Sequence, residues 1–383
     1  MFRRILQPFT SLKLTIVCLS LAMVLVFFGT MEQVQLGIYG AQKKYFDSLF
    51  VFWTLPGTTR QIPILPGGYL LGAITLLNLI AAQAVRFKFN WKKSGIYFLH
   101  LGIIMLLLGQ LFTSLLAKEA QTRLDEGQTK NYSESFTEKE LIFLTKDPSS
   151  TTPQDNVVSI PEGLLTRRDP ITHESLPFTV EVIQYFRNSV AINPSQVSSP
   201  AIPRLPISAE AVLVPIAIAT APDQANAASA EVRVTSPSGS KQVFVVSERI
   251  PAPISFREGD QEISIALRSR RHYKPFSITL HDFTHKTYPG TDIPKDFSSK
   301  VTINHTAASE NRDALIYMNN PLRHGGFTFY QLAFDNDDTT SILQVVKNPS
   351  WLMPYIACGF VTIGLALQFG IHLVGFARKR KTL

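Results

Sequence analysis

One histidine stands in a long apolar stretch of this sequence. The segment from Ser94 to Ala117, SGIYFLHLGIIMLLLGQLFTSLLA, contains no Asp, Glu, Lys or Arg, and its histidine is His100. At about 1.5 Å per helical residue, the segment is long enough to cross a bilayer core of roughly 30 Å. An imidazole in hydrocarbon costs free energy unless it meets a hydrogen-bond partner, a cavity or a metal. We therefore expect His100 to be either a metal ligand or a structural hydrogen-bonding group.

Small residues mark the other side of the same segment. Gly95, Gly102 and Gly109 recur every seven positions, and at about 100° per residue they lie on the helix face opposite His100. Small side chains at this spacing let a neighbouring helix approach closely. The pattern predicts one face for helix packing and one face for function.

A second histidine, His372, lies in the last apolar stretch, four residues after Gln368 and on the same helix face. About six residues separate His372 from Arg378, and about six separate His100 from the start of its own segment. We therefore expect the two histidines at a similar depth, with His100 paired either to His372 or to a histidine of another protein. The alternative for His372 is a structural role, in which its side chain lies near the helix end and extends toward the membrane surface.

Four apolar stretches have the length and composition of membrane spans, at about 12–28, 68–85, 94–116 and 351–376. They predict an integral membrane protein with four transmembrane α-helices. Its regions are a membrane part with three helices (1–117), a β-rich part (118–348), and a fourth helix with a basic tail (349–383). No small-x-small cleavage pattern follows the first span, so we expect a retained anchor rather than a signal peptide.

The region between the third and fourth spans has the period-two alternation of β-strands. It recurs at 178–186, 231–236, 241–248, 262–269, 276–283, 300–305, 314–320, 327–334 and 341–347, with turn residues between. No segment there has a helical period, which predicts a large antiparallel all-β domain. Two stretches rich in Pro, Ser and Ala, about 147–177 and 188–228, are expected to be loops or insertions.

Basic residues cluster beside the spans and explain the net charge of +8. They precede or open the first span, fill the link at 86–93 and follow the last span. These basic residues are Arg3, Arg4, Lys13, Arg86, Lys88, Lys92, Lys93, Arg378, Lys379, Arg380 and Lys381. All 29 acidic residues lie outside these three segments. By the positive-inside rule, we expect both termini and the link to be cytoplasmic and the β-domain to be extracytoplasmic. The charge therefore gives no support for nucleic-acid binding.

Other chemistry has weaker support. Cys18 and Cys358 both lie within spans, so the β-domain has neither disulfides nor a CxxC pair. His281 and His285 have a spacing that metal ligands use, but no third ligand has a convincing spacing, and we expect no metal site there. Asp282 and Asp296 are expected to be turn residues rather than an acid–base pair.

Several longer motifs resemble one family along nearly the whole chain. They are SLKLTIVCLSLAMVLVFFGT, YFLHLGIIMLLLGQ, FSITLHDFTHKTYPGTDIPKDFSSKVTI, IYMNNPLRHGGFTFYQLAFD and VVKNPSWLMPYIACGFVTIGLALQFG, in this order. Together they resemble the ResB (CcsB) family of system II cytochrome c biogenesis. The order and spacing of the motifs make the resemblance specific.

The resemblance implies a subunit in the bacterial inner (plasma) membrane that forms a holocytochrome c synthase with a ResC (CcsA) partner. It is not expected to be a complete enzyme alone. The pair would bring haem across the membrane as a transient, transported substrate and attach it to CXXCH apocytochromes, and a thioredoxin-like thiol reductant is a further implied partner. The histidine of YFLH, here His100, is implied to be an axial ligand of the haem iron, and His372 is a weaker candidate.

One family feature is absent. The partner's tryptophan-rich WWD segment has no counterpart, since the tryptophans are Trp53, Trp91 and Trp351. This chain is therefore not a fused form and is not expected to complete haem attachment alone. The alternative function is a membrane scaffold with a ResB-like fold that binds no haem and stabilises another redox complex.

Overall fold

A computed structural model describes residues 7–58, 60–86, 90–146, 155–167, 169–197, 199, 201–219, 226–250, 252–291, 294–335 and 339–380. Four residues of the basic clusters, Arg3, Arg4, Lys88 and Lys381, and parts of the two expected loop regions lie outside these ranges. The chain divides into two units. The helical unit contains the described parts of Met1–Lys118 and Asn348–Leu383, and the β unit contains those of Glu119–Ala219 and Gln224–Lys347.

Four long helices form the helical unit. They are α2 (Leu12–Ala41), α3 (Gly68–Arg86), α4 (Ser94–Leu116) and α6 (Met353–Arg380). Within the described residues, these are the helices long and apolar enough to cross a membrane by length and composition. Short helical turns accompany them: η1 (Gln7–Thr10), the π-helical η2 (Gln42–Phe46) and η3 (Trp91–Lys93). The four predicted apolar helices are thus present.

The first helix is longer than predicted. α2 continues through Gly29 and Thr30 to Ala41, with a kink at Gly37, where φ is 67°. The residues after Phe28 include good helix formers such as Met, Glu, Gln and Leu, so the backbone does not need to stop where the strongest hydrophobicity stops. Lys44 of η2 reaches back to Glu32 of α2, with Nζ 2.7 Å from Oε2. The hairpin of β1 (Phe50–Thr54) and β2 (Gln61–Pro66) then leads into α3.

A buried asparagine joins the first two long helices. Asn78 of α3 is 2% exposed, and its amide donates to the carbonyls of Phe9 (2.6 Å) and Ser11 (3.1 Å). Its own side-chain oxygen accepts a hydrogen bond from the Thr15 hydroxyl at 2.7 Å. The polar side chain is thereby satisfied by the first turns of α2 and the segment before it, as a buried amide requires.

The β unit is built around one large antiparallel sheet. Its strands lie in the order β15-β14-β13-β4-β3-β18-β17-β16, with β12 paired to β13 and β5 paired to β4. Two three-stranded sheets, β11-β10-β6 and β7-β9-β8, complete the unit. The strand bounds are β3 Lys118–Asp125, β4 Thr129–Lys146, β5 Asp155–Pro161, β6 Thr179–Phe186, β7 Ser189–Ile192, β8 Leu205–Pro206, β9 Val212–Pro215, β10 Ser229–Thr235, β11 Lys241–Ser247, β12 Ile254–Glu258, β13 Gln261–Thr287, β14 Pro294–His305, β15 Glu310–Tyr317, β16 Leu322–His324, β17 Phe327–Phe334 and β18 Thr340–Lys347.

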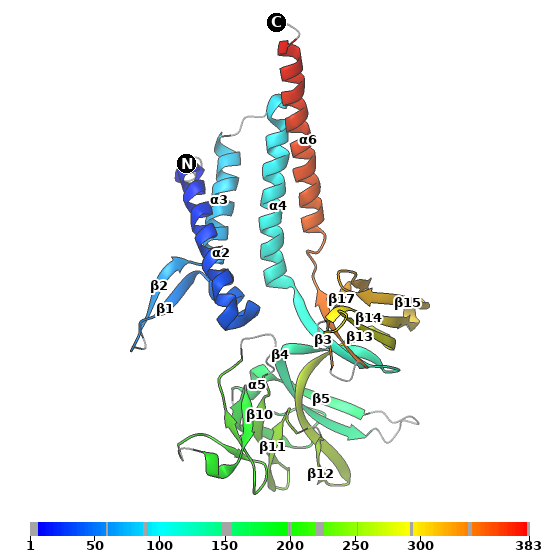
Figure 1. The fold of residues 1–383 in the computed structure, drawn as a ribbon. Helices are drawn as coiled ribbons and strands as arrows, with labels where there is room; N and C mark the ends of the chain where they lie inside the picture. Colours follow the sequence, from blue (N-terminus) through cyan, green and yellow to red (C-terminus); the bar gives the residue numbers. More distant parts are fainter. Residues whose placement is uncertain are drawn as a thin grey trace. The chain divides into compact units, whose positions relative to one another are not determined.

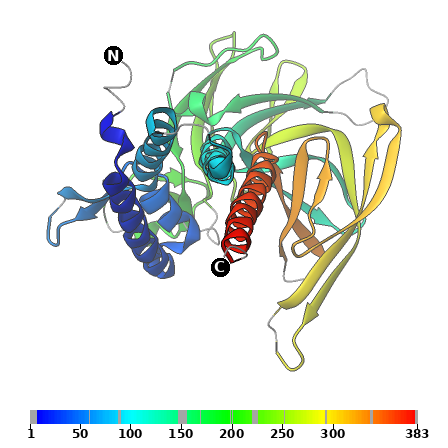
Figure 2. The same cartoon turned by 90° about the horizontal axis from the view of Figure 1, so that it is seen from above.

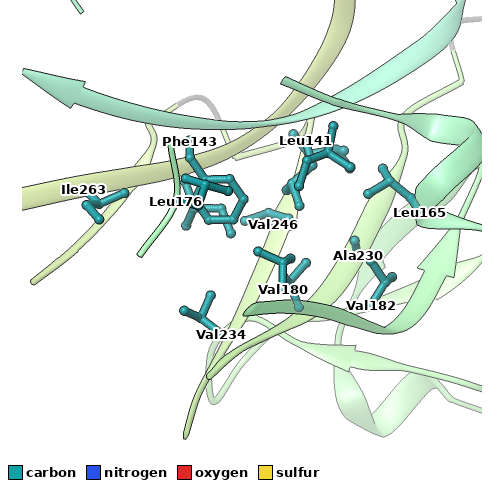
Figure 3. Packing of buried hydrophobic residues seen from close by; sticks show 14 of the residues in the cluster. Leu141, Phe143, Leu165, Leu176, Val180, Val182, Ala230, Val234, Val246 and Ile263 are labelled. Atoms are coloured by element: carbon teal, nitrogen blue, oxygen red, sulfur yellow. The ribbon is translucent and has the colours of Figure 1, made fainter. Parts of the chain in front are cut away.

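Alternating strand residues form two hydrophobic cores. Figure 3 shows the first, where side chains such as Phe143, Val180 and Val234 converge from β4, β6 and β10. The second core lies under the other half of the large sheet and includes Phe276 and Phe329. The strand β4 contributes Leu141 and Phe143 to the first core. The first half of β13 contributes to the first core, and its second half, from Phe276 onward, contributes to the second core. The antiparallel all-β architecture predicted from the alternation is confirmed.

Details of the strand prediction are wrong in three places. The predicted strands 262–269 and 276–283 are one strand, β13, whose pairing with β4 shifts between Ser269 and Arg271 and again between Tyr273 and Ile278. The expected loops at 147–177 and 188–228 contain β5, β7, β8, β9 and the single-turn helix α5 (Glu162–Leu165). β3 and β4 follow α4 directly. Short or charge-rich strands carry little alternation of their own, because their neighbours in the sheet stabilise them.

Candidate functional site

The glycines of α4 form its contact with α6. A β-carbon at Gly95 would lie 2.6 Å from the Gly364 carbonyl oxygen, and one at Gly102 would lie 2.8 Å from the Ala357 carbonyl oxygen. At Gly109 the nearest atom would be Met353 Cβ, at 3.2 Å. The two helices lie side by side (Figures 1 and 2). The small-residue face of α4 is therefore its packing face, as the seven-residue spacing predicts.

These contacts also fix the relative register of the two helices. The two helices run antiparallel. Gly95 of α4 contacts Gly364 and Gln368 of α6, whereas Gly102 contacts Ala357 and Val361, which come earlier in α6. His100 thus lies at the level of residues near Val361, whereas His372 lies one turn beyond Gln368. The histidines are separated by about ten residues, or about 15 Å, along the helix axis. The expectation of similar depth is wrong, because α6 extends past the start of α4 (Figure 1).

His100 lies away from α6, on the opposite side of α4. Its side chain is half-buried, and Nδ1 is buried without a hydrogen-bond partner that meets normal geometry among the described residues. A weaker interaction joins the imidazole to the backbone of Ile96, one turn earlier. Among the described residues, no structural hydrogen bond of normal geometry therefore accounts for this ring nitrogen.

A cavity of about 450 Å³ lies between α3 and α4. It is lined by Gln83 of α3 and by residues of α4, namely Ser94, Tyr97, Phe98, Leu101 and Ile104. Tyr97 and Ile104 are three residues before and four residues after His100, so His100 borders the same side of the helix. Gln83 contributes a buried side-chain oxygen that has no hydrogen-bond partner among the described residues. The cavity is mostly apolar and has a few polar groups at its edge, as ligand sites commonly do.

His372 has a partner within its own helix. Its Nε2 lies 2.8 Å from Nε2 of Gln368, so the amide nitrogen donates to the unprotonated ring nitrogen. The structure therefore gives His372 a hydrogen bond and gives His100 none of comparable quality.

The histidines of the β unit are distributed over several strands. His281 of β13 contacts the Thr302 hydroxyl at 2.6 Å, and the His285 ring packs on Phe334 with centroids 4.2 Å apart. Among the described residues, the ligand-type side chains that converge closely are His305, Glu310 and His324. Sequence spacing does not reveal this cluster, because His305 and His324 belong to different hairpins.

Two of the described lysines in this unit are buried, Lys139 and Lys274, and Lys274 has a shifted pKa. Lys274 of β13 is 7% exposed, and its ammonium group donates to the Ser133 hydroxyl at 2.7 Å. Burial lowers the pKa of Lys274 to about 8, because no carboxylate compensates for the lost hydration.

Comparison with known proteins finds a family match within the β unit. Residues 212–347 match the family model of the ResB-like family. This part of the chain is similar to that family. Protein NrfI of Wolinella succinogenes is 29% identical to it over 106 residues, which make up 28% of this chain and 12% of that protein. The matched part thus represents a small share of the length of NrfI.

The ResB-like region extends from the first residue of β9 to the last residue of β18. It contains two of the motifs on which the resemblance rests. The first forms the end of β13 and most of β14, and the second runs from the end of β15 through β16 and β17. The match confirms the resemblance to the ResB family for residues 212–347.

Proposed function

We propose that this chain is a membrane subunit of system II cytochrome c biogenesis. In this role it acts with a ResC (CcsA) type partner to deliver haem across the membrane for covalent attachment to CXXCH apocytochromes. The match of residues 212–347 to the ResB-like family carries the proposal. The four apolar helices support insertion in a bacterial inner membrane. The basic residues beside them support cytoplasmic termini and an extracytoplasmic β unit.

The proposed haem-binding residue is His100, with haem as a transported substrate. Nδ1 of His100 is buried without a hydrogen-bond partner among the described residues, so the imidazole has unused capacity to bind iron. The adjoining apolar cavity supplies contacts for the planar macrocycle. Bound iron would contribute its affinity for an axial imidazole, and this chain's own residues would position that imidazole in an apolar environment that excludes water.

A second axial ligand would come from another chain. His372 is the other histidine of the helical unit, and it lies about 15 Å farther along the helix axis and bonds to Gln368. Since the packing face of α4 is occupied by α6, a partner helix would approach from the side that carries His100. This arrangement favours a partner histidine over His372 as the second ligand.

The test is the absorption spectrum of the purified full-length protein, alone and co-expressed with a ResC-type partner, for wild type, His100→Gly and His372→Gly. We expect a haem band in the wild type and in His372→Gly, and its loss in His100→Gly. Added imidazole is expected to restore the band to His100→Gly, because the glycine leaves space for a free ligand.

Three outcomes would contradict the proposal. A colourless wild type in both preparations would favour the haem-free scaffold and leave His100 as a structural residue. Full haem content in His100→Gly would show that iron is held elsewhere. Loss of the band in His372→Gly with retention in His100→Gly would reverse the assignment of the ligand.

A further inference from the structure

Two β-hairpins of the second core bring three ligand-type side chains together. His305 is the last residue of β14 and lies directly opposite Glu310, the first residue of β15, across the hairpin. His324 is the last residue of β16, in a hairpin whose turn is Gly325-Gly326. One nitrogen from each imidazole and one carboxylate oxygen all lie within 4.8 Å of one another.

The backbone holds His324 in place. Gly325 and Gly326 both have positive φ, 56° and 80°, as a two-residue type I′ turn requires. A β-carbon at Gly325 would also lie 2.9 Å from the Phe276 ring. The turn therefore depends on glycine for both conformation and space, and it keeps His324 against the second core.

A buried aromatic ring positions both imidazoles. Phe276 is 2% exposed, and its ring meets His324 edge-on with centroids 4.6 Å apart and lies 5.9 Å from His305. The two imidazoles are themselves 5.4 Å apart and nearly perpendicular. The His324 side chain is 8% exposed, and its Nε2 is buried without a hydrogen-bond partner among the described residues. A buried ring nitrogen in this condition has unused capacity for a ligand.

The carboxylate divides its two oxygens between different neighbours. Glu310 Oε1 lies 3.5 Å from Arg312 Nε, and Oε2 lies 3.7 Å from His324 Nδ1. The Arg312 guanidinium also reaches the Arg323 carbonyl at 3.5 Å, on the neighbouring strand. Arg312 can therefore orient the carboxylate through one oxygen while the other faces the histidines, as outer groups do around metal ligands.

We propose that His305, Glu310 and His324 bind a divalent first-row transition ion such as zinc. Two imidazoles and one carboxylate suit such an ion better than calcium or magnesium, which take oxygen ligands. Tetrahedral zinc–nitrogen distances of about 2.0–2.1 Å place ligand atoms roughly 3.3 Å apart. Atoms that now lie within 4.8 Å of one another would approach by up to about 1.5 Å, which side-chain rotation can supply. The ion would join the β14–β15 hairpin to the β16–β17 hairpin and leave one coordination position open. This site is independent of the haem proposal.

The experiment measures zinc bound to the full-length detergent-solubilised protein, purified with a tag that contains no histidine. Zinc is added, excess is removed, and the metal content is determined by mass spectrometry for wild type, His305→Ala, Glu310→Gln and His281→Ala. We expect about one zinc per chain in wild type and in His281→Ala, whose histidine lies on β13 outside the cluster. Zinc affinity should fall at least about tenfold in His305→Ala and in Glu310→Gln. Mutation of a residue that only supports a metal ligand already costs about that much affinity, and these two variants remove a ligand itself.

Glu310→Gln keeps the size of the side chain and so separates lost binding from lost folding. Zinc is expected to raise the thermal unfolding temperature of wild type and His281→Ala, and to raise that of Glu310→Gln much less, because only binding to the folded state stabilises it. Zinc retention by His305→Ala and Glu310→Gln equal to that of wild type would overturn the proposal. Wild-type binding far below one equivalent would overturn it as well.

Discussion

The packing of α4 on α6 gives a sharp prediction for Gly102. A β-carbon there would lie 2.6 Å from Val361 Cγ2 and 2.8 Å from the Ala357 carbonyl oxygen. The carbonyl belongs to a helix backbone and cannot rotate away, so Gly102→Ala must push the two helices apart. Overpacking of this kind costs about 1–3 kcal/mol, and the better helix propensity of alanine returns up to about 1 kcal/mol. We expect a net destabilisation of about 1–2 kcal/mol, and of a few kcal/mol for Gly102→Leu.

Two other glycines provide matched controls. At Gly109 the β-carbon would meet only the Met353 side chain, at 3.2 Å, so Gly109→Ala should change stability little. At Gly72 of α3 a β-carbon would have no neighbour within 4 Å among the described residues, so Gly72→Ala should be neutral or slightly stabilising. The three alanine variants change the same chemical group and differ only in what that group meets.

The measurement is the apparent melting temperature of each detergent-solubilised variant under one set of conditions. A loss of 1 kcal/mol corresponds to roughly 2–4 °C for a protein unit of 150–250 residues. Gly102→Ala should therefore melt several degrees below Gly72→Ala, with Gly109→Ala between them. Equal melting temperatures for Gly102→Ala and Gly72→Ala would refute the close contact of α4 with α6.

Three further variants test buried polar groups through thermal unfolding. Lys274 has a folded-state pKa of about 8 against an ordinary value of 10.5, so wild-type stability should rise between pH 8 and 10.5, where the unfolded chain binds the extra proton. Lys274→Met should remove this rise and add up to about 3 kcal/mol at pH 7, and a parallel pH profile in both proteins would contradict the reasoning. Asn78→Ala should cost about 1–2 kcal/mol because two backbone carbonyls before and at the start of α2 lose their donor; an unchanged melting temperature would argue against this contact. Lys139→Met should cost up to about 3–5 kcal/mol because it removes the cation 2.8 Å from the mostly buried carboxylate of Glu248. The companion variant Lys139→Met with Glu248→Met should recover much of that loss.

Sequence patterns predict the helices because length and hydrophobicity act locally. No charged residue interrupts α4, and its seven-residue glycine spacing identifies the packing face before any neighbour is known. The same reasoning misplaces the end of α2, since helix propensity continues after the apolar run ends. It also misjudges the depth of His372, because depth depends on how far α6 extends past α4, and only the register of their contact determines that distance.

Strands and their clusters depend on distant residues to a greater degree. β13 is one strand because β4 pairs with it on both sides of two register shifts, and neither shift has a mark in the local alternation. His305 and Glu310 meet because they flank one hairpin turn, a local relation that sequence could indicate. His324 joins them only because β16 and β15 are neighbours in space, which no spacing rule predicts.

The arrangement of α4 constrains how a haem-binding subunit could work. Its glycine face is filled by α6, and a ligand as large as haem cannot enter where β-carbons do not fit. The approach to His100 must then come from the side of α3, where the cavity lies, or from a helix of another protein. If His100 held haem, a second histidine contact would have to come from outside the helical unit, because His372 lies about ten residues farther along the helix axis. A partner protein would then be part of the binding site itself, and haem retained by this chain alone should be bound less tightly than haem retained by the complex.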